Sequence, residues 1–183
     1  MNNIQLLWAL VAAQLFLIGF AWTAAIPISK NLRGGIVGLV AFNLALGLGL
    51  LLIGFRGVLP YFIGHTFSNL LCLWSLVAII QAADQLLKIR ISQKEIWVVM
   101  AVAGAGILVL GFDKATADLR AMVLFLTLAW MLSRNGLKIW QLQPEPHLRA
   151  PVKSIAAVGL AVAALLLSRA VTGLFRHDSI EFS

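Results

Sequence analysis

Residues 55–88 read FRGVLPYFIGHTFSNLLCLWSLVAIIQAADQLLK. Pro60 stands where a helix would begin, because proline suits the first turn of a helix. From Tyr61 to Leu87 the sequence then runs for 27 residues with one formally charged side chain, Asp84. Such a helix would be about 40 Å long, against about 30 Å for the hydrocarbon core of a bilayer. The segment 61–87 is therefore predicted to span a membrane.

Composition assigns the rest of the chain to the same class. Of its 183 residues, 61% are hydrophobic and 11% are charged, and the mean hydropathy is +0.96. A soluble domain has about 45–50% apolar and about 25% charged residues. The sequence predicts an all-α integral membrane protein whose main partner is the lipid bilayer. The net charge is +7, and in membrane proteins an excess of Lys and Arg usually lies in the cytoplasmic loops. No nucleic-acid partner is therefore expected.

Six apolar segments alternate with charged or proline-containing turns. This pattern predicts one domain over residues 1–183, built as a bundle of six transmembrane helices. The spans are expected at about 4–28, 36–55, 61–87, 96–112, 119–139 and 151–175. The longest loop is expected at 141–151, which contains three prolines.

The Lys and Arg residues are distributed unevenly between the two sides of the predicted bundle. Nine follow the first, third and fifth spans, and five lie on the opposite side. The richer side should be cytoplasmic. A multi-pass topology with the N-terminus outside is therefore expected, and six spans would place the C-terminus outside as well.

Small residues repeat along the second span. Ala41, Ala45 and Gly49 fall four apart on one helix face. Small side chains at this spacing allow two helix backbones to approach closely in lipid. We expect this face to pack against another helix, either within the chain or across a homodimer.

Polar residues inside spans are the candidate ligand-binding residues. His65, Asn69, Cys72 and Ser75 repeat at helical spacing in the third span, and Asn43 lies deep in the second. The stripe could line a ligand cavity, but such groups more often form hydrogen bonds between helices.

Arg169 lies near the end of the sixth span. Its side chain could extend to the interface or contact an anion, with Asp113 or Asp118 as a candidate partner. The ligand-binding candidates are therefore Asn43, His65, Asn69 and Arg169.

Signals for catalysis are missing from the sequence. No HExxH, GxSxG or Walker motif occurs, and no pair of carboxylates shares a helix face. A single cysteine, Cys72, can form neither a disulfide nor a cysteine-based metal site within the chain. The sequence thus predicts no enzyme, no catalytic residue, no metal and no cofactor.

The quoted stretch resembles the membrane-bound sensor region that precedes GGDEF domains in many bacterial diguanylate cyclases. That family carries LRGxIPDWLSxxLxNxLLLLGxxLLxxGLRRF, and Arg56, Gly57, Pro60 and Asn69 match it in order. The segment NLALG at 43–47 is similar to the family's GNLLLALG. Two departures are the tyrosine at position 61, where the family usually has an acidic residue, and the missing last sensor helix and GGDEF domain.

The resemblance implies a sensory module of the bacterial inner membrane in cyclic di-GMP signalling. Its partner would be a GGDEF-containing protein or a missing C-terminal domain. The alternative is a small membrane transporter or channel, which needs a continuous polar path to both sides of the bilayer. A membrane enzyme is the third reading.

Overall fold

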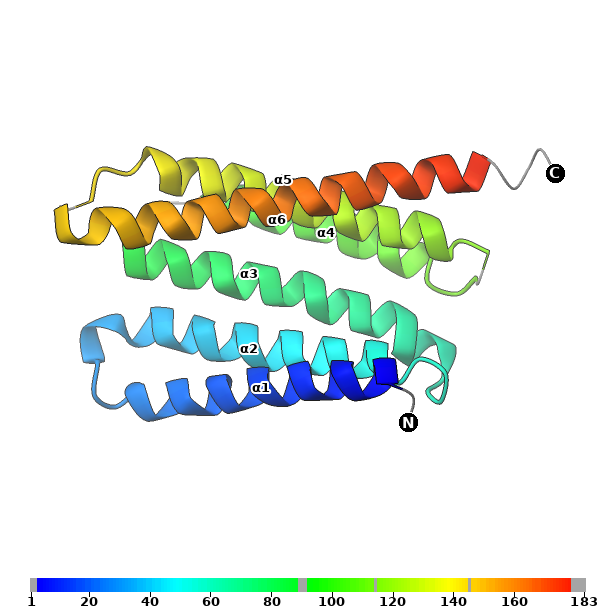
Figure 1. The fold of residues 1–183 in the computed structure, drawn as a ribbon, viewed down its shortest axis with the longest axis horizontal. Helices are drawn as coiled ribbons and strands as arrows, with labels where there is room; N and C mark the ends of the chain where they lie inside the picture. Colours follow the sequence, from blue (N-terminus) through cyan, green and yellow to red (C-terminus); the bar gives the residue numbers. More distant parts are fainter. Residues whose placement is uncertain (1–2, 89–91, 114, 145, 179–183) are drawn as a thin grey trace.

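The computed structural model describes residues 3–88, 92–113, 115–144 and 146–178, and it confirms an all-α fold (Figure 1). No strand occurs within these ranges. Six α-helices and two short helical turns follow one another along the chain: α1 (Asn3–Ala25), η1 (Lys30–Leu32), α2 (Arg33–Gly54), η2 (Phe62–Phe67), α3 (Ser68–Leu87), α4 (Gln93–Val109), α5 (Ala117–Gln141) and α6 (Pro146–Asp178).

Four helical segments are long and apolar enough to cross a bilayer: Asn3–Ala25, Lys30–Gly54, Phe62–Leu87 and Leu148–Thr172. The outermost helices, α1 and α6, are mostly unburied and present large apolar side chains outward, among them Leu17 and Phe20 of α1 and Val158 and Leu165 of α6. In water such surfaces would be unfavourable, whereas lipid chains solvate them. These helices therefore support the prediction that the chain is a membrane protein.

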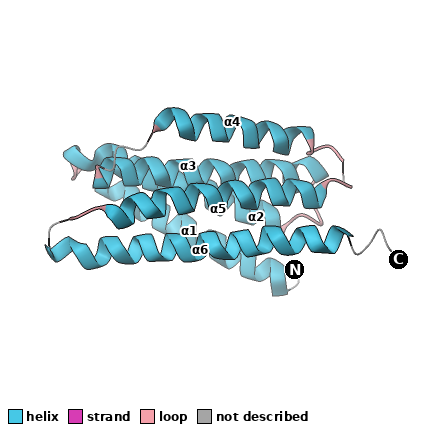
Figure 2. Cartoon of the chain, turned by 90° about the horizontal axis from the view of Figure 1, so that it is seen from above, coloured by secondary structure: helices cyan, strands magenta, loops and turns pink. Residues whose placement is uncertain are grey.

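The helices are arranged in a row rather than a closed ring. α1 packs on α2 and α2 on α3, and Figure 1 shows these three side by side. Beyond α3 lie α4 and α5, and α6 packs on α5. Figure 2 shows α4 and α6 on opposite sides of α5.

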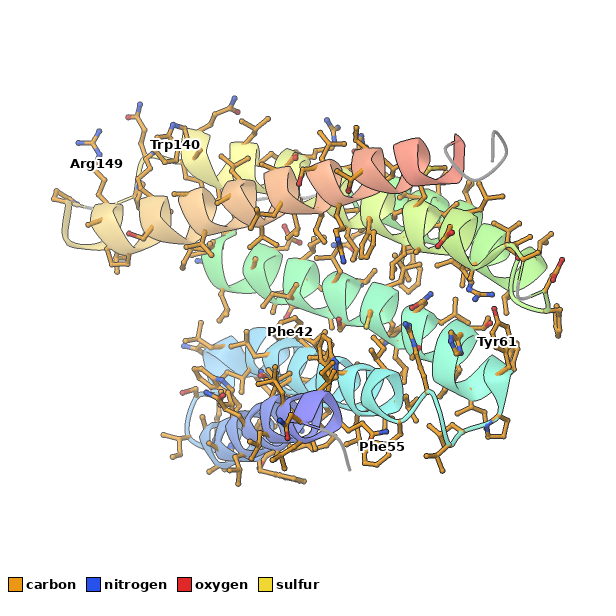
Figure 3. All side chains as sticks on the ribbon, turned by 45° about the vertical axis from the view of Figure 1, so that its right-hand side comes forward. Phe42, Phe55, Tyr61, Trp140 and Arg149 are labelled. Carbon is orange, nitrogen blue, oxygen red and sulfur yellow. The ribbon has the colours of Figure 1, made fainter. Side chains whose placement is uncertain are left out.

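The two ends of the molecule differ in the connections that they carry. The start of α1, the α2–η2 and α4–α5 connections and the end of α6 lie at one end (Figure 1). We call this the Tyr61 end and the opposite one the Arg149 end; both residues are labelled in Figure 3.

Glycines of α2 allow it to pack closely on both sides. Towards α3, a side chain on Gly38 would meet the Ala78 carbonyl oxygen at 3.0 Å, and one on Gly49 would meet Cys72 Sγ at 3.0 Å. Towards α1, a side chain on Gly54 would meet Trp8 Cβ at 2.8 Å. Of the predicted packing residues, Gly49 is thus buried against α3, whereas Ala41 and Ala45 are half-buried.

A second small-residue interface joins α5 and α6. The three alanines of α6 that are almost fully buried, Ala156, Ala163 and Ala170, recur every seven residues. Opposite them, a side chain on Gly136 of α5 would meet Leu160 at 3.1 Å. Close approach of backbones through small residues is the usual way in which helices associate in lipid.

The core between α3, α4 and α5 is apolar. It consists of two clusters of large aliphatic side chains and one alanine: Leu73, Leu76, Val77, Ile80, Ile96, Ala103, Ile107, Leu124 and Met131.

The connection between α5 and α6 is shorter than the predicted loop 141–151. Helix α6 begins at Pro146 and contains Pro151 near its start. Pro146 suits the first position of the helix, whereas Pro151 lies in its second turn and removes one backbone hydrogen bond there. Pro144 thus lies in the connection, and Pro146 and Pro151 lie in the first two turns of α6 rather than in a loop that ends at Pro151. The predicted span 61–87 also differs, because its first turn is the π-helical η2.

Candidate functional site

The π-helical turn η2 carries His65 into a group of polar residues at the Tyr61 end. A π turn leaves backbone carbonyls unpaired, and here other groups bond them. The Gly64 carbonyl oxygen accepts from Ser68 Oγ at 2.7 Å and from Arg56 Nε at 2.8 Å. A side chain on Gly64 would meet Arg56 Cα at 3.1 Å, so glycine lets the two segments approach.

Arg56 holds the loop before η2 against α3. Its Nη2 donates to Asn69 Oδ1 at 3.2 Å, and Asn69 is 6% exposed. Burial lowers the pKa of the Arg56 guanidinium below its usual value, and the nearby positive charge of Arg120 lowers that pKa further.

Arg120, in the first turn of α5, is the largest fully buried side chain among the described residues, with 1% of its surface exposed. Its Nη1 donates to the Leu110 carbonyl oxygen at 2.9 Å, at the C-terminal end of α4. Its Nη2 donates to the Tyr61 hydroxyl at 2.6 Å, and the guanidinium lies 5.2 Å from the centre of the Tyr61 ring. The Nε of Arg120 is buried without a hydrogen-bond partner in the described part of the chain.

Tyr61 connects this arginine to the π turn. Its ring stacks on that of His65 at 4.4 Å between centres, and its hydroxyl donates to the Asp113 carbonyl oxygen at 3.3 Å. We call Arg56, Tyr61, His65, Asn69 and Arg120 the arginine cluster.

The α4–α5 connection also contacts η2 beside this cluster, through the side chain of Thr66. Thr66, which is fully buried, donates from Oγ1 to the Gly111 carbonyl oxygen at 2.9 Å. A side chain on Gly111 would meet Thr66 Cγ2 at 2.6 Å. The π turn and the α4–α5 connection are therefore in direct contact, and the arginine cluster joins the α1–α3 row to α4 and α5.

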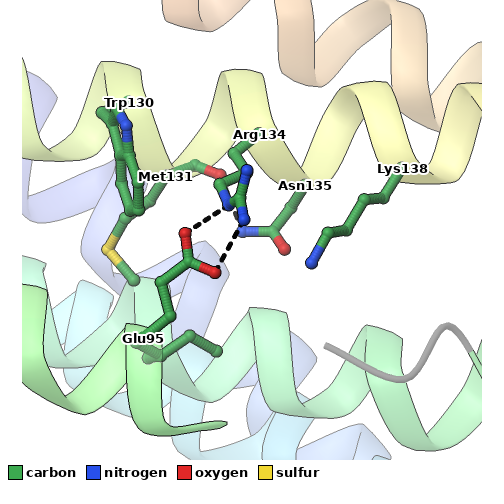
Figure 4. A pocket seen from close by; sticks show the side chains of 7 residues that line it. Glu95, Trp130, Met131, Arg134, Asn135 and Lys138 are labelled. Carbon is green, nitrogen blue, oxygen red and sulfur yellow. Dashed lines mark hydrogen bonds and ion pairs between the residues drawn. The ribbon is translucent and has the colours of Figure 1, made fainter. Parts of the chain in front are cut away.

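A second polar group lies near the Arg149 end and forms a shallow pocket (Figure 4). Arg134 forms an ion pair with Glu95, its Nη2 donating to Glu95 Oε2 at 2.8 Å, and it lies 5.8 Å from the centre of the Trp130 ring. Asn135 donates to the Met131 carbonyl oxygen at 2.7 Å, and its Oδ1 is buried without a partner in the described residues. Here the charge of the arginine is matched by a carboxylate.

The structure brings together two of the four predicted ligand-binding residues. His65 and Asn69 both belong to the arginine cluster. Asn43 lies elsewhere, on the side of α2 that faces Gly19 of α1, and its amide donates to the Leu39 carbonyl oxygen at 2.8 Å within its own helix.

The fourth residue, Arg169, is exposed on α6. In the described part of the chain it forms no ion pair with Asp113 or Asp118.

Sequence reasoning missed Arg56, Tyr61 and Arg120 as members of the site. A signal for Arg120 was present, because a basic residue in the first turn of a helix opposes the helix dipole and needs another reason to be there. The structure supplies that reason: Arg120 reaches back to the C-terminal end of α4, where positive charge is favourable.

No protein-family model, curated protein or solved structure matches this chain. The resemblance to sensor regions of diguanylate cyclases therefore stays a prediction, and function is inferred from the geometry of the chain itself.

Proposed function

We propose that the chain is a membrane-embedded sensory module rather than an enzyme, and that it works in the bacterial inner membrane with a GGDEF-containing partner. The observation that carries this proposal is the arginine cluster. It places a buried charge at the contact between two groups of helices, where a change in that charge's surroundings would alter how the groups pack.

The proposal includes six membrane spans, with α4 and α5 added to the four long apolar segments. Helix α4 has 17 residues, or about 25 Å at 1.5 Å per residue, close to the hydrocarbon thickness. The charges of α5 lie towards its two ends, with Asp118 and Arg120 at one and Arg134 and Lys138 at the other. Arg134 and Lys138 can extend to the interface, as long basic side chains near helix ends do, whereas Arg120 is buried and bonded within the protein.

A sensor needs two arrangements that a cue can tell apart. The α1–α2–α3 row is closely packed through glycines, and α5 and α6 are joined through alanines. Between these groups the Tyr61 end contains hydrogen bonds from Arg120, Tyr61 and Thr66. A cue that rearranges these bonds would shift one group against the other.

The apolar core argues against the alternative, a carrier or channel. A carrier needs polar groups that lead to both sides of the bilayer. Between the arginine cluster and the Glu95–Arg134 pocket, the interface of α3, α4 and α5 is filled by large aliphatic side chains. This arrangement suits a site that opens to one side.

The test is a chimera in which the chain continues through one further transmembrane helix into an active diguanylate cyclase domain. We expect Arg120→Gln to change cellular cyclic di-GMP at least twofold at equal membrane levels. The matched control is Arg149→Gln, which removes the same charge from an exposed position in α6 and should leave output unchanged. Equal output from both variants and the parent would refute the sensory role, and solute flux in proteoliposomes would then favour the carrier.

A further inference from the structure

Two arginines at the Tyr61 end, Arg56 and Arg120, form no ion pair with the nearby Asp113 or Asp118 in the described residues. The ion pair found in the described residues, Glu95–Arg134, lies near the other end and involves neither Arg56 nor Arg120. Removing a charge from water is strongly unfavourable unless the charge is paired and hydrogen-bonded. The charges of Arg56 and Arg120 are therefore not neutralised by an ion pair within the described residues.

Arg120 is also incompletely hydrogen-bonded. A guanidinium presents five N–H donors in a planar fork that matches the oxygens of carboxylate or phosphate. Both acceptors that bond Arg120 are neutral, a carbonyl and a phenol, and its Nε has no partner in the part of the chain that the structure describes. A buried donor without a partner destabilises the protein unless something else supplies an acceptor.

Arg56 is the more accessible of the two arginines. It is half-buried, it lies in the loop before η2, and its bonds to Gly64 and Asn69 also go to neutral oxygens. Both arginines lie beside the π turn, because Arg56 bonds the Gly64 carbonyl oxygen and Arg120 bonds Tyr61, whose ring stacks on His65. Their like charges therefore repel each other. An anion beside both would replace that repulsion with two attractions.

We propose that the arginine cluster is an oxyanion-binding site for a phosphate-type group, with Arg56 and Arg120 as its charged ligands. This inference deepens the proposed function, since it names the class of cue for the same site. The group is either the phosphate of a lipid headgroup or a soluble phosphate, because both offer the same oxygens to the guanidinium forks.

Tyr61 links anion binding to the helices. Its ring covers the Arg120 guanidinium at 5.2 Å, so an anion reaches Arg120 when this ring moves aside. The same residue stacks on His65 of the π turn and donates to Asp113 in the α4–α5 connection. Displacement of Tyr61 would therefore change contacts in both η2 and the α4–α5 connection.

The test measures binding on the purified full chain, separately from signalling. In nanodiscs of phosphatidylcholine, inorganic phosphate at constant ionic strength should raise the melting temperature in a saturable way, by roughly 5 °C at a hundredfold excess over its dissociation constant. If the source is a headgroup, phosphate will have no effect and nanodiscs containing phosphatidylglycerol will give the rise instead. Arg120→Gln and Arg56→Gln should each weaken the response at least tenfold, whereas Arg149→Gln should leave it unchanged.

Tyr61→Glu is a second variant that does not depend on losing an arginine. It places a carboxylate beside Arg120 within the chain, so this variant should be stable without an anion and should lose the response to it. The proposal is overturned if neither phosphate nor phosphatidylglycerol raises the melting temperature of the parent chain, or if Arg149→Gln reduces the rise as much as Arg120→Gln. A binding response without any change in chimera output would instead leave the anion site standing and reject the sensory role.

Discussion

The two arginines of α5 occupy contrasting surroundings. Arg134 is 47% exposed, pairs with Glu95 and lines a shallow pocket, whereas Arg120 is 1% exposed and has only neutral partners. An exposed ion pair contributes little to stability, because its charges are hydrated whether the pair is formed or broken. A buried unpaired charge is different, because its free energy depends strongly on any group that comes beside it. Of the two, Arg120 is the one suited to detecting a ligand.

The largest expected effect concerns membrane topology, which decides whether Arg120 or Arg134 lies near the outer side of the membrane. Charge counting puts the Arg149 end in the cytoplasm and both termini outside. Alkaline phosphatase fused after Ser183 should therefore be active and green fluorescent protein at the same position dark. The opposite pair of results would place the Tyr61 end, and with it the arginine cluster, on the cytoplasmic side.

The second effect is the stability difference between the two arginines. Arg120→Ala should lower the free energy of unfolding by about 3 kcal/mol, because it removes two hydrogen bonds and leaves a buried cavity. Arg134→Ala should lower it by less than about 1 kcal/mol. Reversible unfolding in mixed micelles measures both.

Arg120→Met serves as the control for volume. It fills much of the same space and removes the unpaired charge, so it should destabilise less than Arg120→Ala. If methionine is as damaging as alanine, the hydrogen bonds of Arg120 outweigh the unfavourable burial of its charge.

The sequence predicted the helical class and helix positions to within a few residues for most elements, because apolar length and charged turns are properties of single segments. It also placed His65 and Asn69 on a common face. The partners of these residues could not be predicted, because Tyr61 and Arg120 are 59 positions apart and meet only through the packing of three helices. The π turn was missed for a similar reason, since it depends on Arg56 and Ser68 bonding the freed carbonyls.

The alanine face of α6 is visible in the sequence alone. Ala156, Ala163 and Ala170 recur every seven residues, as small residues at a helix interface do. The predicted packing face was confined to α2, where glycine contacts with both neighbours made the pattern harder to assign to one partner.

The third effect compares the contact between η2 and the α4–α5 connection with a position inside α4. Gly111→Ala should lower the free energy of unfolding by about 1–3 kcal/mol, because the new methyl group would lie 2.6 Å from Thr66. Gly104→Ala, within α4, is the matched control: its nearest neighbour would be Leu70 at 4.0 Å, so it should stabilise the helix by up to about 1 kcal/mol. If the two substitutions have the same sign, the close contact between η2 and the α4–α5 connection is not maintained in the membrane.

The smallest expected effect is at the paired arginine. Glu95→Gln should lower the free energy of unfolding by less than about 1 kcal/mol, since the pair is part-exposed and its charges are hydrated when it breaks. A double-mutant cycle with Arg134→Gln isolates the interaction, and the coupling should shrink between low and high salt because surface charges are screened. A coupling above about 2 kcal/mol that salt does not change would indicate a pair shielded from water. The two ends would then not differ in the way proposed, because the charge of Arg134 would be shielded from water as that of Arg120 is.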